Sequence, residues 1–135
     1  MPPILREMDV AVFTNRAEGG TNLVAMECMA SGVPVILSRN TGHLDLIEDD
    51  NCYPLDDQKI DEDHWGNVGD IRCWGESQVD EVVERLEQVL ADRAAAKRRG
   101  MRAAAMMQGM TWAETARRMK QVVLGAAQNN AREAA

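Results

Sequence analysis

Two short runs of apolar, mostly β-branched residues flank a helical stretch near the start of the chain. Asp9 to Thr14 and Val33 to Ser38 are the apolar runs, and each predicts a buried strand. A helix is expected over Leu23 to Ser31, because Asn22 is a good N-cap and Gly32 suits the left-handed residue at a helix C-terminus. Two buried strands joined by a helix predict a right-handed βαβ unit in a parallel sheet.

The chain beyond the second strand predicts one more strand and then a long connection. A short helix is expected over residues 43–48, and Asn51 to Leu55 predict a third strand. Residues 56–76 are rich in acidic residues and glycine and have little periodicity. This pattern predicts a long surface loop.

Three helices are predicted in the second half of the chain. The first is capped by Ser77, the second runs from Arg93 to Met107, and the third runs from Thr111 to about Ala127. The apolar side of the first helix is formed by Val79, Val82, Val83, Leu86, Val89 and Leu90. Flexible core filler is the interpretation of Met106, Met107, Met110 and Met119. The domain is expected to span residues 1–127, and residues 128–135 are expected to form a frayed tail.

The composition is that of one soluble domain. The 135 residues are 45% hydrophobic and 27% charged, both ordinary values for a globular protein. No apolar stretch approaches the roughly 18 residues that a membrane span needs, and the first residues do not resemble a signal peptide. Cys28, Cys52 and Cys73 are odd in number and far apart, which predicts reduced thiols in a cytoplasmic protein.

The net charge of −7 is distributed unevenly along the chain. Residues 1–43 carry −1, residues 44–92 carry −13, and residues 93–135 carry +7. The basic positions of the second predicted helix are Arg93, Lys97, Arg98, Arg99 and Arg102. We interpret them as a solvated helix face near an acidic neighbour, because nucleic-acid binding proteins are usually basic overall and this chain also has few aromatic residues for stacking.

The turn before the first helix carries the clearest chemical signal. It follows a parallel strand, at the edge of the sheet where open α/β proteins bind their ligands. Gly19 and Gly20 are expected to adopt positive φ angles and to let a ligand approach the backbone closely. The amides of Thr21, Asn22 and Leu23 would then point at an anion from the positive end of the helix, which suits a phosphate. A tight strand-to-helix connection without a ligand is the alternative interpretation.

Glu27 lies in a helix that is apolar almost all round, so the sequence predicts a buried carboxylate. A buried carboxylate without a partner is costly. One interpretation is a structural partner, either a basic side chain or a backbone group. The other is a carboxylate that accepts hydrogen bonds from sugar hydroxyls, with Glu18 on the turn reaching a second set.

These residues resemble a known family. The segment Glu18-Gly-Gly-Thr-Asn, followed by Met26-Glu27-Cys-Met-Ala-Ser-Gly-Val-Pro-Val-Ile36, is similar to the donor-binding segment of retaining GT-B glycosyltransferases of family 4, the glycosyl transferases group 1 domain. That family carries a Glu-x7-Glu motif and a Glu-Ala-Met-Ala-x-Gly-x-Pro-Val run. The resemblance is close from Asp9 to about Leu55 and looser in the terminal helices, at residues 77–90 and 111–112.

The resemblance implies a fold, a ligand and residue roles. The fold would be α/β, a partial Rossmann-like C-terminal GT-B domain with a parallel sheet of about three strands and flanking helices. The co-substrate would be a nucleotide-diphosphate sugar, with no metal and no other cofactor. Glu18 would contact hydroxyls of the transferred sugar as the catalytic-site glutamate, and Glu27 would hold the ribose. Donor-binding positions would include Gly19, Gly20, Thr21, Asn22 and Leu23, whose amides would hold the diphosphate. The turn from Asn40 to Asp45 would take the place of the family's Gly-Gly-x-x-Glu turn.

Two departures from the family pattern limit what the chain is expected to do alone. The spacing here is Glu-x8-Glu, one residue longer than usual, so the role of Glu18 is less well supported than that of Glu27. A complete GT-B enzyme also has an acceptor domain and further donor-domain strands upstream of the matching segment. We therefore expect a fragment that is completed by an N-terminal acceptor domain or a partner chain, and that does not transfer sugar by itself.

Other functions stay open at this point. Another GT-B enzyme, such as a sugar-nucleotide epimerase, would lack the Glu…Glu-x-Met-Ala run. A non-catalytic nucleotide-sugar-binding module, or a subunit completed by a partner, is the alternative outside enzymes. His43 and Cys52 share an x8 spacing with His64 and Cys73, but structural zinc sites use closer ligand pairs, so no metal is expected.

Overall fold

The computed structural model describes residues 3–59 and 74–133, and of residue 6 and residues 126–133 it describes the backbone alone. In chain order the elements are η1 (Pro3–Glu7), β1 (Ala11–Phe13), α1 (Leu23–Ala30), β2 (Val35–Ser38), η2 (Thr41–Asp45), β3 (Tyr53–Leu55), β4 (Gln58–Lys59), β5 (Glu76–Ser77), α2 (Val79–Ala91), α3 (Arg93–Gln108) and α4 (Trp112–Glu133). The fold is α/β, as the sequence predicted.

The central sheet has three parallel strands in the order β1-β2-β3. Val12 lies opposite Ile36, and Ile36 lies opposite Tyr53. The βαβ unit β1-α1-β2 and the third strand are therefore confirmed. This arrangement is consistent with part of a Rossmann-like domain, and it places the carboxyl ends of β1 and β2 at one edge of the sheet.

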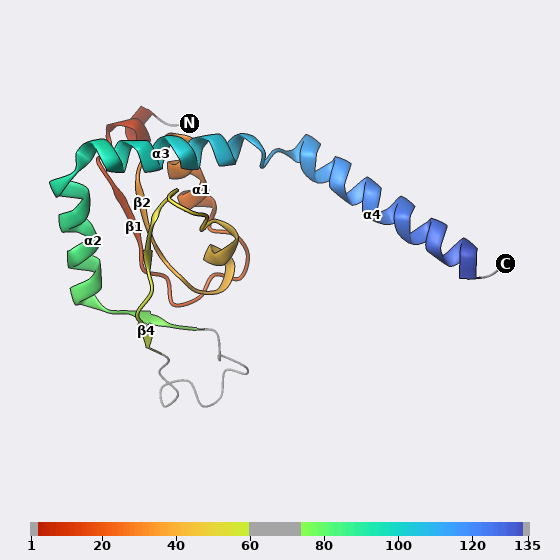
Figure 1. Cartoon of the computed structure of the whole chain (residues 1–135), viewed down its shortest axis with the longest axis horizontal. Coiled ribbons are helices and arrows are strands. Elements are labelled where there is room, and N and C mark those ends of the chain that lie inside the picture. Colours follow the sequence, from red (N-terminus) through yellow and green to blue (C-terminus); the bar gives the residue numbers. More distant parts are fainter. Residues whose placement is uncertain (1–2, 60–73, 134–135) are drawn as a thin grey trace.

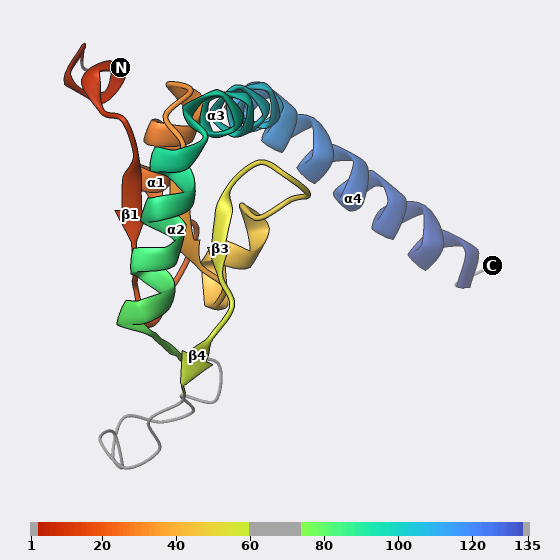
Figure 2. The ribbon, with the colours of Figure 1, turned by 60° about the vertical axis from the view of Figure 1, so that its left-hand side comes forward.

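Alternate residues of the buried strand β2 serve two hydrophobic cores. Val35 and Leu37 pack with α1 and α3 on one face of the sheet. Ile36 points to the other face, where it packs with Val89 of α2. Figure 2 shows α1 and α2 on opposite sides of the strands. The continuous apolar run of β2 is thus explained by burial on both faces.

The ends of α1 are formed as predicted. The Asn22 side chain accepts a hydrogen bond from the Ala25 amide at 3.1 Å, which is an N-cap. Gly32 has a φ of +77°, the left-handed conformation expected after the helix. Local residue chemistry therefore determines both ends of this helix.

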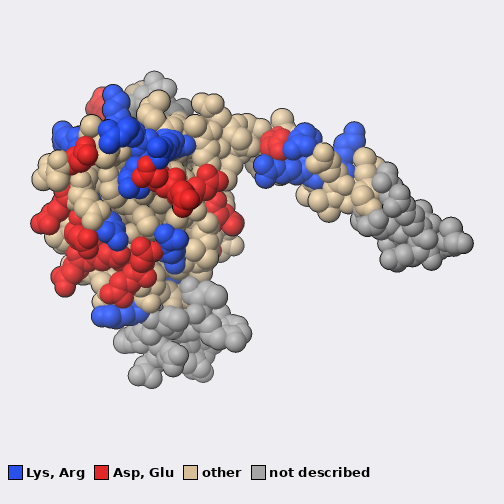
Figure 3. All heavy atoms as spheres, in the orientation of Figure 1, with Lys and Arg blue, Asp and Glu red and all other residues tan. Residues whose placement is uncertain are grey.

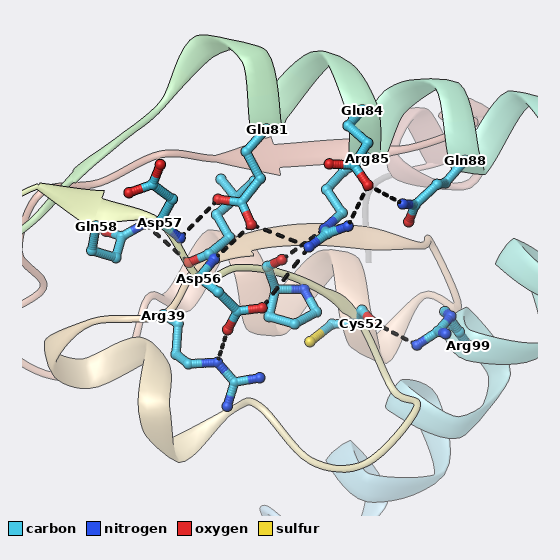
Figure 4. Close-up of polar contacts among 12 residues, drawn as sticks. Arg39, Cys52, Asp56, Asp57, Gln58, Glu81, Glu84, Arg85, Gln88 and Arg99 are labelled. Atoms are coloured by element: carbon cyan, nitrogen blue, oxygen red, sulfur yellow. Dashed lines mark hydrogen bonds and ion pairs between the residues drawn. The ribbon is translucent and has the colours of Figure 1, made fainter.

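The predicted cap of α2 was wrong. Ser77 lies in β5, and its hydroxyl accepts a hydrogen bond from the Gln58 side chain at 2.8 Å. The N-cap residue is Gln78, which makes no side-chain cap bond. The first turn of α2 is instead held by Glu81, whose carboxylate accepts from the amides of Asp56 and Asp57 at 2.9 and 3.0 Å (Figure 4).

The segment predicted as one long loop contains a short antiparallel ladder. Gln58 of β4 lies opposite Ser77 of β5. Gly75 is needed beside this ladder, because a Cβ there would lie 2.7 Å from the Cβ of Gln58. The remainder of the predicted loop, residues 60–73, lies outside the described residues, as do His64 and Cys73.

The apolar face of α2 faces the core only in part, which corrects the prediction. Val89 is buried and Val82 is partly buried against the sheet. The other four apolar residues of the face are exposed: Val79, Val83, Leu86 and Leu90. The described sheet has only three strands, so it contacts one edge of the apolar face of α2 and the rest of that face stays exposed.

The methionines predicted as core filler also divide into buried and exposed ones. Met107 is buried, whereas Met110 and Met119 are exposed.

α3 crosses α1 at close range and carries the five basic residues of the second predicted helix. A Cβ on Gly100 would lie 2.2 Å from the Gly32 carbonyl oxygen, so the helix backbone approaches the α1–β2 corner directly. Arg99 donates to the Cys52 carbonyl at 2.9 Å and pairs with Asp50 at 2.8 Å. Arg102 pairs with the same carboxylate. These ion pairs agree with the interpretation of a basic helix near an acidic neighbour.

α4 projects away from the body of the protein (Figure 1). Its helical backbone continues to Glu133, beyond the predicted boundary at residue 127.

Acidic side chains gather over α2 and the nearby strands, while basic ones follow α3 and α4 (Figure 3). Within the described part of the chain, no helix is long and apolar enough to cross a membrane.

Candidate functional site

The turns that follow β1 and β2 meet at the carboxyl edge of the sheet. The Glu18 amide donates to the Thr41 hydroxyl at 2.7 Å, and the Gly42 amide donates to the Glu18 carbonyl at 3.2 Å. This edge is where open α/β sheets bind ligands. The structure therefore brings the predicted glycine-rich turn together with the turn around Asn40 to Asp45.

Gly42, and not the pair of glycines before α1, is the glycine that this junction requires. A Cβ on Gly42 would lie 1.4 Å from the Gly20 carbonyl oxygen, so no other residue fits without a backbone shift. Gly19 and Gly20 have open space where a Cβ would lie, and neither has a positive φ. The predicted positive φ at these two positions was wrong, because two backbones packed against each other set the turn geometry.

A buried histidine connects the two turns to the start of α1. The His43 Nδ1 lies 3.1 Å from the Ser38 carbonyl oxygen, and its Nε2 lies 3.1 Å from the Asn22 side-chain nitrogen. Since a carbonyl only accepts, Nδ1 carries the proton and Nε2 accepts from Asn22. Burial lowers the pKa of His43, although the Ser38 carbonyl and the Glu18 charge oppose the shift. The ring is thus neutral and holds the N-cap residue in place.

Side chains at the carboxyl end of β2 also hold the turn after β1 through hydrogen bonds. Asn40 is buried, and its side-chain nitrogen donates to the Asn15 carbonyl at 2.9 Å and to the Gln58 side chain at 2.8 Å. The Ser38 hydroxyl donates to the same Asn15 carbonyl at 2.8 Å. A rigid polar scaffold therefore lies beneath the predicted ligand-binding turn.

Glu27 is exposed, which corrects the prediction of a buried carboxylate. α1 packs against the sheet and α3 through Ala25, Cys28 and Met29. The opposite face is open to solvent and presents Glu27 with Leu23 and Val24 one turn before it. A helix that is apolar all round was expected to be covered all round, but its neighbours cover only one side. The carboxylate needs no buried partner and is accessible to a ligand.

Glu18 is half-buried, and its carboxylate accepts a hydrogen bond from the Asn15 side chain at 3.2 Å. At the start of α1, the Ala25 amide donates to the Asn22 side chain and the Met26 amide to the Asn22 carbonyl. Within the described part of the chain, no hydrogen bond engages the amides of Thr21, Leu23 or Val24. These free amides give the helix start the capacity to hold an anion.

A groove of about 860 Å³ lies beside this helix start. Thr21, Leu23 and Met26 form one wall, and Met110 and Thr115 from the α3–α4 corner lie across from them. The sequence pattern did not predict this groove, because its walls come from segments some ninety residues apart. His43 was also missed as a site residue, although it lies in the turn from Asn40 to Asp45 to which the family resemblance pointed.

His43 and Cys52, the one pair with the x8 spacing among the described residues, show no features of a metal site. Both ring nitrogens of His43 are engaged by protein groups. Cys52 is buried, and burial raises the pKa of its thiol to about 11, which disfavours the thiolate that binds metals. Among the described residues, no group of three or more potential ligands could hold a metal ion.

Comparison with known proteins gives one match that covers most of the chain. The family model described as "Family 4 Glycosyltransferase in conflict systems" matches residues 3–119. No curated protein matches the chain. The chain therefore belongs to the family 4 glycosyltransferases of conflict systems.

Proposed function

We propose that this chain binds a nucleotide-diphosphate sugar at the carboxyl edge of its sheet and takes part in the transfer of the sugar to an acceptor. Membership of the glycosyltransferase family over residues 3–119 is the observation that carries this proposal. The family description would place that transfer in a conflict system. The geometry of the turn after β1 supports the same ligand class.

The diphosphate would be held at the start of α1. The unengaged amides of Thr21, Leu23 and Val24 can donate to phosphate oxygens, and the partial positive charge of a helix N-terminus favours an anion. Gly19 and Gly20 lie in open space, so a ligand can approach the backbone between them and the helix. No metal is required for this binding mode, because amide donors neutralise part of the phosphate charge.

Two glutamates would then hold the hydroxyl groups of the donor. Glu27 is exposed on α1, one turn from the proposed phosphate position, which suits the hydroxyls of the nucleotide ribose. Glu18 is on the turn itself and would contact the transferred sugar. His43 would act as a positioning residue, because it holds Asn22 and thereby the first turn of α1.

The test is donor binding to the isotope-labelled chain by NMR. UDP-glucose, GDP-mannose and ADP-glucose are titrated separately, and we expect at least one of them to shift the amide signals of residues 19–27. Glu27→Gln should weaken that binding by about 1–3 kcal/mol, the usual worth of a hydrogen bond to a charged group. In affinity this is a loss of roughly five- to 150-fold.

Glu48→Gln is the matched control, since Glu48 is also exposed and lies outside the turn at residues 18–23 and outside α1. It should leave the affinity unchanged. Signal changes that avoid residues 19–27, or equal affinity of the Glu27→Gln variant, would contradict the assignment of the site. Donor binding without transfer in a radiolabelled-donor assay is the expected result for a chain that needs an acceptor domain or partner, and transfer by the chain alone would contradict that expectation.

A further inference from the structure

Two helices expose apolar stripes that the body of the protein does not cover. On α2 the stripe consists of Val79, Val83, Leu86 and Leu90, of which Val79 is 74% and Leu90 69% exposed. On α4 the stripe consists of Trp112, Ala116, Met119 and Val123, of which Trp112 is 90% and Met119 67% exposed. Exposed apolar stripes of this kind mark interaction surfaces.

The two stripes have the same spacing. Steps of four, three and four residues lead from Val79 to Leu90 and, again, from Trp112 to Val123. This is the heptad spacing of helices that pack side by side at a shallow angle. Each stripe covers roughly 16 Å of helix at 1.5 Å per residue, so the two match in length.

The charges beside the stripes are opposite in sign. On α2, Asp80 comes directly after Val79 and Glu87 directly after Leu86, so the two acidic residues share one heptad position. On α4 the equivalent position holds Lys120, which is exposed. Two α2 helices would bring acidic residues together and two α4 helices would bring lysines together, whereas α2 against α4 pairs a lysine with a carboxylate. Residues at this position face each other when the helices are antiparallel.

The two stripes cannot meet within one chain. α3 lies between the end of α2 and the start of α4, and its 16 residues span roughly 24 Å. Figures 1 and 2 show α2 and α4 at opposite ends of this helix. Within the described part of the chain, the two stripes therefore do not cover each other.

We propose that α4 of one copy packs antiparallel on α2 of a second copy of this chain. The apolar stripes form the seam, with Val79 opposite Val123 and Leu90 opposite Trp112, and in this register Lys120 pairs with Asp80. The contact joins two different surfaces, so it is heterologous and can recur from copy to copy. None of these stripe residues lies in the turn at residues 18–23, but Trp112 also lines the groove beside the start of α1.

The first measurement is the mass of the purified chain by light scattering at increasing concentration. We expect species of at least twice the 14.9 kDa monomer. Met119→Asp on α4 and Val83→Asp on α2 should each give monomers at the same concentration, because a charge would be buried in the seam. Circular dichroism should show that both variants are folded, since both positions are exposed.

Mixing the two variants provides the decisive test. The Met119→Asp chain retains an intact α2, and the Val83→Asp chain retains an intact α4, so the mixture should recover a one-to-one complex. Gln121→Asp and Gln88→Asp add the same charge on the outer faces of α4 and α2 and should leave the association unchanged. These controls separate the seam from a general effect of net charge.

A charge exchange tests the orientation without removing apolar surface. Lys120→Glu should weaken the association at least tenfold, and Asp80→Lys in the same chain should restore it. A wild-type chain that is monomeric at all concentrations would overturn the proposal and assign the stripes to another protein. Association that survives Val83→Asp but not Met119→Asp would overturn it in favour of α4 pairing with α4.

Discussion

The His43 ring, in the η2 turn, joins the end of β2 to the cap of α1, which lies twenty-one residues earlier in the chain. Ser38 and Asn22 engage its two nitrogens, and all three side chains are buried. Such a network is stable only while each member keeps its partner, because a buried polar group without a hydrogen bond is costly. The protonation state of one ring therefore affects the whole carboxyl edge.

The pH dependence of stability should reveal this histidine. Burial lowers the pKa of His43 from the ordinary value of 6.5, so the unfolded chain binds a proton at a higher pH than the folded one. Stability is fully present above the unfolded pKa and falls as pH drops through about 6.5 towards the folded pKa. Urea unfolding at pH 7.5, 6.5 and 5.5 measures this slope.

His43→Gln should flatten that pH slope, whereas His64→Gln provides the control with the second histidine of the sequence. If the free energy of unfolding of the wild type were constant between pH 7.5 and 5.5, the lowered pKa of His43 would be contradicted. If the pH slope disappeared in the His64→Gln variant instead, His64 would be the titrating group and the interpretation of His43 would be contradicted.

Gly42 is the residue at which the two turns come closest. In Gly42→Ala the new methyl group would meet the Gly20 carbonyl oxygen, so both turns must move. We expect a loss of about 1–3 kcal/mol in the free energy of unfolding, the usual range for overpacking. Gly19→Ala is the matched control, because a Cβ there meets no atom within 4 Å. Denaturant unfolding that shows equal effects for the two variants would contradict the close packing.

At the scale of elements, the packing of α3 on the α1–β2 corner organises the larger core. Ala103 and Met107 of α3 are buried together with Met29 of α1. The helix comes this close because Gly100 has no side chain to hold it away. Helices in such close contact have complementary shapes, so added side-chain volume lowers the free energy of unfolding.

Gly100→Ala should therefore destabilise the protein despite the better helix propensity of alanine. A methyl group at this position would lie 2.2 Å from the Gly32 carbonyl oxygen, and we expect a loss of about 1–3 kcal/mol. Gly125→Ala in α4 makes the same change with nothing within 4 Å and should be neutral or stabilising by up to about 1 kcal/mol. Thermal unfolding of both variants measures the contrast; a stabilised Gly100→Ala protein would refute the close approach.

At the scale of the whole molecule, a compact α/β body carries one helix that extends from it. Both hydrophobic cores are formed by residues between Leu5 and Met107. α4 begins after them at Trp112 and leaves most of its side chains exposed. The acidic middle of the sequence thus gathers over α2 and the nearby strands, while the basic end follows α3 on the body and α4 beyond it (Figure 3).

A chain that ends at Thr111 should fold like the full chain, because truncation removes no core residue. We expect a melting temperature within a few degrees of the full chain and a smaller helical signal in circular dichroism. The truncated chain should also remain monomeric, since it lacks the stripe of α4. A truncated chain that is unfolded at room temperature would show that α4 contributes to the core.

Local sequence determined the elements and their ends wherever a short-range interaction was sufficient. The apolar runs of β1 and β2, the Asn22 cap and the left-handed Gly32 needed only neighbouring residues, and all are present in the structure. The parallel sheet followed from two buried strands joined by a helix. The family resemblance likewise rested on contiguous residues, and the family match over residues 3–119 confirms it.

Tertiary structure alone decided which apolar faces are covered and which backbones touch. Glu27 is exposed because α1 has neighbours on one side only, and the stripe of α2 is exposed because the sheet beneath it is narrow. Gly42 is required because a carbonyl twenty-two residues earlier packs against it. Hydrophobic periodicity reports that a face is apolar, but it carries no information on how many partners are available to bury it. That information resides in contacts between segments far apart in the chain.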